Sequence, residues 1–438
     1  MPDDARDELL LPPAPAPAPA PTPPWQDGPA VKAAQGRVLR VLLVAQVVGS
    51  FGTGSTIAVG SLLTTSIIDG AGFAGVSPTC MTLGAALFGV PMGVLAARSG
   101  RRRALGLGWL TASAGSLLVV GAAVTESPLL LVAGLLMVGS GTATTLQSRF
   151  AGTDLSAPGR RGSTLSLMVW SGTLGAVLGP NLGAPGELIE SALDLPVYSG
   201  SFIISLTMFA AAGVIVLLCL RPDPLEVTRT HSGMPVRVAG APRVGGGVGA
   251  ALRTIWTTPH ARFALLAVIA SHVSMVSLMT MTPVHMLHRG ETVSLIGLTI
   301  SMHVLGMFAL SPLVGMATDR FGPVRVIVVS QLLFLTTTAV VHLGGHGSVS
   351  MVLALFLLGL AWSCGTVPGA ILLSDSVPAT TRSTAQGVLD TSMNAIAAVA
   401  ALSAGPIYSA IGFGGLSLLV IVIAIPLATM LPRDRTAA

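Results

Sequence analysis

Three ionisable side chains interrupt long apolar stretches of this sequence, and their chemistry suits proton transfer. Asp390 lies seven residues beyond Ser383, so on a helix beginning there its carboxyl group is roughly 10 Å inside the apolar stretch. His272 and His303 are further candidates, because imidazole titrates near physiological pH. Ionisable groups in such surroundings are costly and therefore indicate function. Two alternatives stay open: each histidine is a hydrogen-bonded core residue, or Asp390 pairs with Arg98.

The sequence lacks the motifs of common enzyme classes. A phosphate-binding loop needs a lysine after its glycines, but the only lysine is Lys32, near the N-terminus. Neither HExxH nor GxSxG occurs. The three cysteines form no CxxC pair and lie in apolar stretches, so they predict neither a disulfide nor a metal site. We therefore expect no enzyme activity, no cofactor and no metal. The cysteines are Cys80, Cys219 and Cys364.

The composition indicates where the ionisable groups must sit. Hydrophobic residues make up 52% of the chain and charged residues 9%, whereas a soluble domain carries about 25% charged residues. Twelve apolar segments are each near the roughly 20 residues that a helix needs to cross a bilayer. The sequence therefore predicts an all-α membrane protein with twelve transmembrane helices, and its net charge of +5 is not taken to indicate nucleic acid as a partner. The predicted spans are 38–63, 72–97, 103–124, 128–152, 162–183, 201–220, 261–286, 293–318, 324–343, 348–374, 384–409 and 412–432.

The distribution of positive charge predicts the orientation. Arg289 is the only Lys or Arg in the loops after odd-numbered spans, whereas the tails and the other loops hold most of the others. Because positive loops stay on the cytoplasmic side, both termini are expected in the cytoplasm. A proline-rich segment at the start favours extended, disordered chain. The expected partition is a disordered cytoplasmic tail over 1–36, six-helix bundles over 37–220 and 261–438, the second ending in a short tail, and a cytoplasmic linker over 221–260.

Charged motifs in two loops recur at a nearly constant offset. GVLAARSGRRR and GMATDRFGPVR are shifted by 222 residues (315 − 93), and TDLSAPGRR and SDSVPATTR by 221 (375 − 154). Matched positions at one offset indicate that the chain contains two copies of one half. The matched residues are Gly93 with Gly315, Arg98 with Arg320, Gly100 with Gly322, Asp154 with Asp375 and Arg161 with Arg382.

Asp319, in the second copy of the loop motif, is expected to join the two halves. It lies where the eighth span leaves the membrane, and a carboxylate there can face the positive N-terminal end of a neighbouring helix. By repeat symmetry its target is the start of span five, near 162–164. Neighbouring arginines such as Arg101 can pair with acids of adjacent spans and complete a cytoplasmic gate. The alternative, that 101–103 only fix membrane orientation, stays open.

These residues resemble the major facilitator superfamily of secondary transporters. The resemblance covers the chain after the tail: six plus six spans, a long central loop, and the loop motif GxxxDRxGRR in both halves. The second copy has the acid of that motif at Asp319, whereas Ala97 replaces it in the first. Ser383 and Gln386 have the spacing of a capping box, which would satisfy the start of span eleven locally. We expect this side of the gate to be looser than its counterpart.

Span five carries a second motif, GTLGAVLGPNLG, that is similar to the pattern of drug:proton antiporters within the superfamily. Glycines four apart allow close helix approach, and proline bends the helix, although a merely well-packed helix is the alternative. Those antiporters carry an arginine in span four where this chain has Leu135. Arg149 is instead expected to pair with Asp154 or to anchor its helix at the membrane surface. The motif comprises Gly175, Gly179, Pro180 and Gly183.

The resemblance implies a central substrate cavity formed by spans one, four, seven and ten. Its expected lining is adaptable and mostly apolar, although a Met and His stripe on span seven also suits Cu(I) as an alternative. We expect a monomeric secondary active transporter of the cell membrane, with the lipid bilayer, protons and a small molecule as partners. Proton-coupled efflux of lipophilic compounds, as in multidrug resistance, is the preferred interpretation; an uptake permease and, more remotely, a non-transporting sensor are alternatives. The expected cavity residues are Gln46, Gln147, His272, Met275, Met279 and Trp362.

Overall fold

The computed structural model describes residues 24–68, 76–178, 182–231, 247–291, 293–343 and 347–430. Within these ranges nine helices are long and apolar enough to cross a membrane, by length and composition. The helices are α1 (Pro29–Ile67), α2 (Val76–Thr125), α3 (Pro128–Thr153), α4 (Arg161–Ser171), α5 (Thr173–Leu178), α6 (Gly183–Leu193), α7 (Gly200–Cys219), α8 (Pro224–His231), α9 (Val248–Thr257), α10 (Pro259–His288), α11 (Val293–Val304), α12 (Ser311–Phe321), α13 (Pro323–Leu343), α14 (Ser348–Ser376) and α15 (Arg382–Thr429), with 3-10 turns η3 (Pro24–Asp27) and η5 (Pro158–Arg160) and a π-helical turn η7 (Leu305–Ala309).

Two of the long helices each contain two spans. Gly100 breaks α2 with φ 85°, and Gly412 breaks α15 with φ 68°, a backbone conformation that glycine adopts at little steric cost. Counting these helices twice gives eleven spans (9 + 2), and α4 with α5 supplies the twelfth. The prediction of twelve transmembrane helices is therefore confirmed.

Span five contains a one-residue interruption at Gly172, where the backbone keeps right-handed helical angles of φ −68° and ψ −19°. The sequence predicts a single span over 162–183. In the structure, α4 ends at Ser171 and α5 ends at Leu178. Gly179 and Pro180 of the predicted motif lie outside the described residues, and Gly183 begins α6. Gly175 packs against α1, because a Cβ atom at this position would lie 2.3 Å from the Ser50 carbonyl oxygen. Helix approach at this glycine is as close as the motif predicts.

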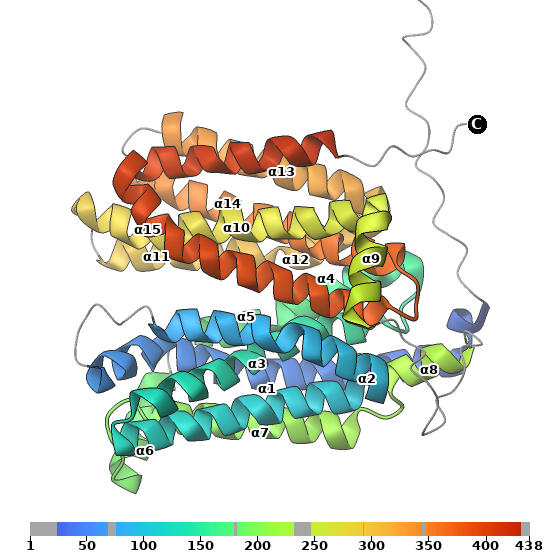
Figure 1. Ribbon diagram of the computed structural model, residues 1–438, viewed down its shortest axis with the longest axis horizontal. Coiled ribbons are helices and arrows are strands. Elements are labelled where there is room, and N and C mark those ends of the chain that lie inside the picture. Colours follow the sequence, from blue (N-terminus) through green and yellow to red (C-terminus); the bar gives the residue numbers. More distant parts are fainter. Residues whose placement is uncertain are drawn as a thin grey trace, which may run out of the picture.

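The helices form two bundles that lie side by side in Figure 1, with α1–α7 in one and α10–α15 in the other. Each bundle has its own apolar core; Trp109 stacks on Phe209 in the first at 5.6 Å between ring centroids, and Phe334 is buried in the second. The internal repeat is visible in the backbone, because Gly100 and Gly322 have nearly equal φ angles of 85° and 86°. The two halves are thus copies of one architecture, as the sequence predicts.

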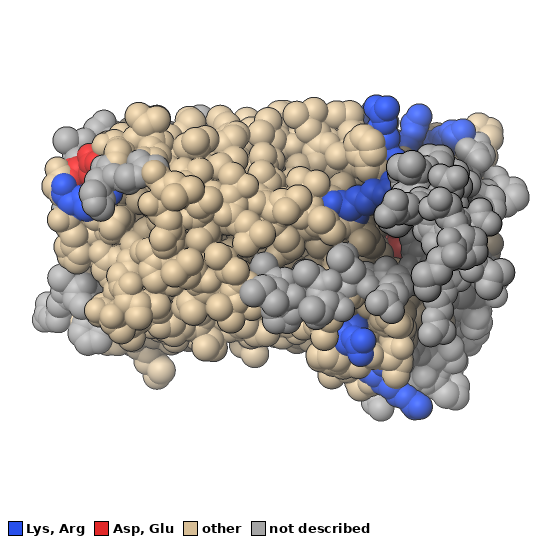
Figure 2. All heavy atoms as spheres, turned by 90° about the horizontal axis from the view of Figure 1, so that it is seen from above, with Lys and Arg blue, Asp and Glu red and all other residues tan. Residues whose placement is uncertain are grey.

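One end of the molecule, which we call the basic end, carries α8 and α9 (Figure 1). The loop at Gly100 lies at this end, because the Arg102 amide donates to Asp223, which directly precedes α8. The repeat-related loop at Gly322 follows α12, which packs along α4. On the face seen in Figure 2, Lys and Arg gather at this end, and other residue types form a broad band toward the opposite, far end. Large apolar side chains remain exposed within the spans, such as Val399 (66%) and Leu402 (64%). An apolar belt between two charged ends is the surface that a lipid bilayer covers.

The bundles meet through two pairs of helices related by the repeat. α2 packs along α15, and α12 packs along α4. Glycines permit this approach, because a Cβ atom at Gly162 would lie 2.4 Å from the Gly315 carbonyl oxygen. Deeper in the first pair, the Thr391 hydroxyl donates to the Ala86 carbonyl at 2.8 Å and accepts from the Val90 amide at 2.9 Å. These contacts close the two bundles against each other in the half nearest the basic end.

Candidate functional site: contacts between the bundles at the basic end

Asp319 makes the contact that the repeat predicts. At the end of α12, its carboxylate accepts hydrogen bonds from the backbone amides of Gly162 (2.7 Å) and Ser163 (2.8 Å) and from the Ser163 hydroxyl (2.6 Å). The first amide groups of a helix have no partner within it and carry partial positive charge, so a carboxylate is a suitable cap. Asp319 therefore joins the C-terminal bundle to the start of α4 in the N-terminal bundle.

A more exposed ion pair lies beside this cap. Arg161, which begins α4, pairs with Asp375 near the end of α14, and their side chains are 18% and 38% exposed. Arg382 occupies the repeat-related position, and its Nε atom is buried without a hydrogen-bond partner in the described part of the chain. Arg98 is exposed, and Arg320 lies over the ring of its neighbour Phe321, 5.3 Å from the centroid. The charged residues of the two loops thus differ widely in their surroundings.

Arg101 is fully buried and bonds to both bundles. Its guanidinium donates to both carboxylate oxygens of Asp154 (2.8 and 3.2 Å), to Gln147 (3.2 Å) and, across the interface, to Gln386 (2.7 Å). The Gln386 amide in turn donates to the Ser374 hydroxyl at 3.0 Å. The capping-box role predicted for Gln386 with Ser383 is therefore wrong, because the glutamine side chain points to Arg101 and α14.

A second ion pair is buried one helical turn deeper than Gln386. Unlike the pair of Arg101 and Asp154, it crosses the interface between the bundles. The Arg149 guanidinium of α3 donates to Asp390 of α15 at 2.7 Å, and Gln147 donates to the other carboxylate oxygen at 2.8 Å. The two side chains are 4% and 0% exposed. The predicted pairing of Arg149 with Asp154 is wrong, and so is the alternative pairing of Asp390 with Arg98. α3 continues to Thr153, which keeps Arg149 on the helical face toward α15.

Together these side chains form one continuous network, which we call the interface network: Asp154, Arg101, Gln147, Asp390 and Arg149. Two carboxylates balance two guanidinium groups, so the buried network is neutral as long as both acids are ionised. Protonation of Asp390 would remove one charge and leave Arg149 without its partner. Because uncompensated buried charge is costly, the network links the ionisation of one carboxyl group to contact between the bundles.

The comparisons with known proteins identify the family. The sequence pattern of the Major Facilitator Superfamily matches residues 42–292 and 265–438. The chain belongs to this superfamily. It is 35% identical over 356 residues to the uncharacterized MFS-type transporter YddS of Bacillus subtilis, covering 81% of this chain and 80% of that protein. It is 26% identical over 400 residues to the riboflavin transporter RfnT of Brucella anthropi, covering 91% and 96% of the two chains.

Solved structures show the same fold. The human organic anion transporter MFSD10 superposes with a TM-score of 0.69 at 16% identity, covering 91% of this chain and 99% of that chain. The transporter FucP in its outward conformation gives a TM-score of 0.67 at 16% identity, covering 90% and 99%. This superfamily member is therefore a multi-pass membrane transporter of small molecules, and not an enzyme.

The predicted cavity residues of this superfamily member fall into different environments. The His272 ring on α10 accepts a hydrogen bond at Nδ1 from the Trp362 indole of α14 at 2.8 Å, which assigns the proton of a neutral ring to Nε2. Phe308 of the π-helical turn packs edge-on against Trp362 at 5.8 Å. Met275 belongs to the apolar core of the C-terminal bundle, and the partly buried Met279 packs against it. The cluster of His272, Trp362 and Phe308 is thus polar and aromatic, and apolar side chains surround it.

Two further residues from the sequence analysis are buried within single bundles. His303 is fully buried and donates from Nδ1 to the Leu355 carbonyl at 2.9 Å, which ties α11 to α14 as a hydrogen-bonded core residue does. Gln46 on α1 is 2% exposed, and its Oε1 atom has no hydrogen-bond partner within the described ranges. Neither residue contributes to the interface network.

The linker supplies contacts that the sequence analysis missed. Asp223 accepts a hydrogen bond from the Arg102 amide at 2.8 Å, just after the Gly100 break, and another from Leu225 at 3.0 Å. Arg229 of α8 donates to the carbonyl oxygen of Ala97, the position that lacks the family's acid. The sequence does contain a pattern that could have predicted these contacts, because Asp223 is followed by an acid three residues later, as in a helix-capping box. α8 thereby holds the first loop motif from the linker side.

Proposed function

We propose that this transporter is a proton-coupled exporter of lipophilic small molecules in the plasma membrane, with its basic end and both termini in the cytoplasm. The observation that supports this most is the buried pair of Arg149 and Asp390 between the bundles. Intramembrane carboxylates that pair across moving elements are typical of proton relays. We call the inter-bundle contacts at the basic end, including the interface network and the Asp319 cap, the gate.

The proposed cycle uses the ionisation of Asp390 to control the gate. When Asp390 is ionised it holds Arg149, and the bundles stay together on the cytoplasmic side. A proton that arrives from outside breaks this pair, and the gate opens because Arg149 then gains more from water than from its buried position. The proton then leaves Asp390 for the cytoplasm, and a substrate enters the central cavity from the same side. The pair of Arg149 and Asp390 forms again and closes the gate behind the substrate.

The chemistry of the central cluster supports an apolar substrate. His272 and Trp362 bind each other, and Phe308 covers the indole, so these groups present aromatic surface with one hydrogen-bonding edge. Methionine side chains nearby adapt to ligands of different shape. Such a lining favours flat lipophilic compounds over sugars or phosphates, whose many polar groups would stay unsatisfied there.

Everted membrane vesicles provide the test. Respiration acidifies the vesicle lumen, and a compound exchanged for protons raises the luminal pH, which a pH-sensitive dye reports. A panel of toxic lipophilic compounds should yield at least one such response with the native protein, and none with Asp390→Asn. Asp375→Asn, which breaks an exposed ion pair, should retain the response. Proton release that survives in Asp390→Asn would reject this carboxylate as the coupling site.

An uptake permease is the second candidate, and one specific observation favours it. The relative from Brucella anthropi, which aligns over 91% of this chain, is named a riboflavin transporter. The aromatic pair of Trp362 and Phe308 offers surface on which a flat ring system would stack. Riboflavin accumulation in right-side-out vesicles, but not in everted ones, would favour uptake, whereas the opposite result supports export. A non-transporting sensor would move no compound in either preparation.

A further inference from the structure

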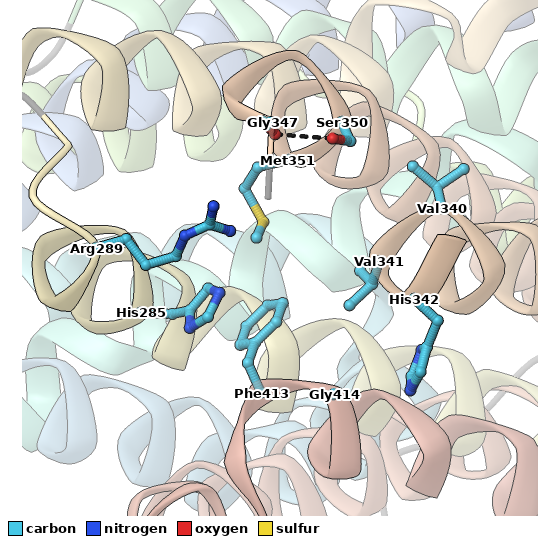
Figure 3. A pocket seen from close by; sticks show the side chains of 10 residues that line it. All are labelled: His285, Arg289, Val340, Val341, His342, Gly347, Ser350, Met351, Phe413 and Gly414. Carbon is cyan, nitrogen blue, oxygen red and sulfur yellow. Dashed lines mark hydrogen bonds between the residues drawn. The ribbon is translucent and has the colours of Figure 1, made fainter. Parts of the chain in front are cut away.

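α10 has different surroundings at its two ends. Its last turn, at His285, borders a pocket of about 290 Å³ that Met351 and Phe413 also line, within the C-terminal bundle (Figure 3). Its first turn lies at the basic end and adjoins the short helix α9. The pocket lies among the helices of one bundle, whereas α9 carries exposed apolar and basic side chains.

The helix α9 lies across the basic end of the molecule. Figure 1 shows it running across the ends of the long helices rather than along them. Thr258, which ends α9, has an extended backbone with φ −99° and ψ 111°, as the following Pro259 favours, so the chain turns between α9 and α10. A candidate membrane span begins at Pro259, directly after this turn. α9 therefore lies at the level where α10 enters the bilayer.

One face of α9 packs on the protein. Ala251 and Ile255 are fully buried, and α9 contacts both α10 and α15. The two side chains lie four positions apart, and therefore on the same side of the helix. They belong to the apolar cluster that also contains Ala385 and Leu389 of α15. This face thus holds α9 against the segment of α15 that carries Asp390.

The neighbouring face of α9 is apolar and exposed. Leu252 and Trp256 are 38% and 51% exposed, and each follows a buried position, about 100° further around the helix. Tryptophan is enriched in membrane proteins where lipid tails meet headgroups. A helix that lies in the plane of the membrane buries its apolar side at this depth. The face of Leu252 and Trp256 therefore suits the surface of a bilayer.

The outer side of α9 is basic. Arg253 is exposed and lies two positions from both Ala251 and Ile255, so it points away from the buried face. Arg262 adds a second positive charge in the first turn of α10. The sequence from 247 to 290 contains no acid, and the single acid of α15, Asp390, is buried and paired with Arg149. Neither α9 nor the helices that it packs against therefore neutralise the positive charge of Arg253.

From this combination we propose that α9 is a binding surface for acidic phospholipids in the leaflet at the basic end. The lipid phosphate would bind Arg253, since a guanidinium binds phosphate through two parallel hydrogen bonds. Leu252 and Trp256 would lie among the upper parts of the acyl chains. The bilayer is the apolar phase within reach of Trp256, because the candidate span begins three residues later. A bound lipid would restrain α9 and the part of α15 that α9 packs against.

Brominated lipids test this surface, because bromine quenches tryptophan fluorescence only at short range. The full-length protein is placed in phosphatidylcholine nanodiscs that contain a small fraction of brominated lipid, either phosphatidylglycerol or phosphatidylcholine. The quenching that is lost in Trp256→Phe, measured in each background, is the part due to Trp256. At equal fractions, brominated phosphatidylglycerol should quench this part at least about fivefold more than brominated phosphatidylcholine, because one arginine near the membrane attracts acidic lipid by about this factor.

Three variants separate the contribution of Arg253 from general positive charge. Arg253→Gln should lower the ratio of the two quenching values about fivefold. Arg253→Lys keeps the charge and should retain most of the ratio. Arg325→Gln, which removes an exposed arginine at the start of α13, is the matched control and should leave the ratio unchanged.

Several results would overturn the proposal. Equal quenching by the two brominated lipids would remove the preference for acidic lipid, and an unchanged ratio in Arg253→Gln would place that preference elsewhere. No quenching of Trp256 by either lipid would show that α9 does not face the bilayer. If soluble glycerol phosphate abolished the ratio while sodium chloride at the same ionic strength did not, the surface would bind free phosphate compounds instead. A native-like unfolding temperature of Arg253→Gln in pure phosphatidylcholine excludes misfolding as the cause.

Discussion

Replacing Asp390 by asparagine removes one charge from the interface network and keeps the size of the side chain. In the closed gate, Arg149 would then stay buried without its partner from α15, and removal of one partner from a buried pair costs about 3–5 kcal/mol. Separation of α3 and α15 returns the guanidinium to water, so this cost falls on the closed state alone. Since a factor of ten corresponds to about 1.4 kcal/mol, the equilibrium should shift toward the open gate by roughly 10²- to 4 × 10³-fold.

The accessibility of a buried position at the interface measures this shift. Ser383 is 3% exposed, and its carbonyl oxygen lies against Gly93 of the other bundle. A cysteine at position 383, in a background without the native cysteines, should react slowly with a membrane-impermeant maleimide applied from the basic end. Asp390→Asn should accelerate the reaction toward the limit set by a permanently open gate. The native cysteines to be replaced are Cys80, Cys219 and Cys364.

Two controls make the experiment decisive. Asp375→Asn also breaks an ion pair between the bundles, but an exposed one, whose loss costs about 0–1 kcal/mol and should change the rate less than about fivefold. The double variant Arg149→Gln with Asp390→Asn places two neutral groups in contact and should react more slowly than Asp390→Asn alone. Equal rates for the two aspartate variants, or a double variant that reacts fastest, would refute the reasoning.

Three further predictions concern other contacts at the basic end. Asp319→Asn should weaken the cap of α4 by about 1.5–3 kcal/mol, because its hydrogen bonds are charge-assisted, and hydrogen exchange of the first amides of α4 should accelerate accordingly. Gly315→Ala should hinder closure and raise the same labelling rate, because its Cβ atom would lie 2.4 Å from a carbonyl oxygen, whereas Gly159→Ala, with nothing within 4 Å, should leave the rate unchanged. Asp223→Asn should loosen the linker where it accepts the Arg102 amide, and faster hydrogen exchange confined to α8 and this turn would show it; unchanged exchange would contradict the linker's role.

The sequence was most informative where backbone geometry alone determines a contact. Asp319 could be assigned its partner because a helix start always presents free amides, and because the internal repeat names which helix start is near. Arg149 could not be assigned in the same way. Its long side chain reaches residues on several helices, and Asp154 was the nearer acid along the chain, yet Asp390 lies 241 positions away.

Composition, helix length and internal repetition by themselves determined that this protein has twelve membrane spans in two related halves, with a charged loop in each, because these properties depend on local sequence and on the thickness of a bilayer. The tertiary structure alone decided which polar side chains meet: Arg101 with Asp154 and Gln386, and Arg149 with Asp390. Such contacts depend on how helices far apart in the sequence pack and on which way flexible side chains turn, and no periodicity of the chain encodes either.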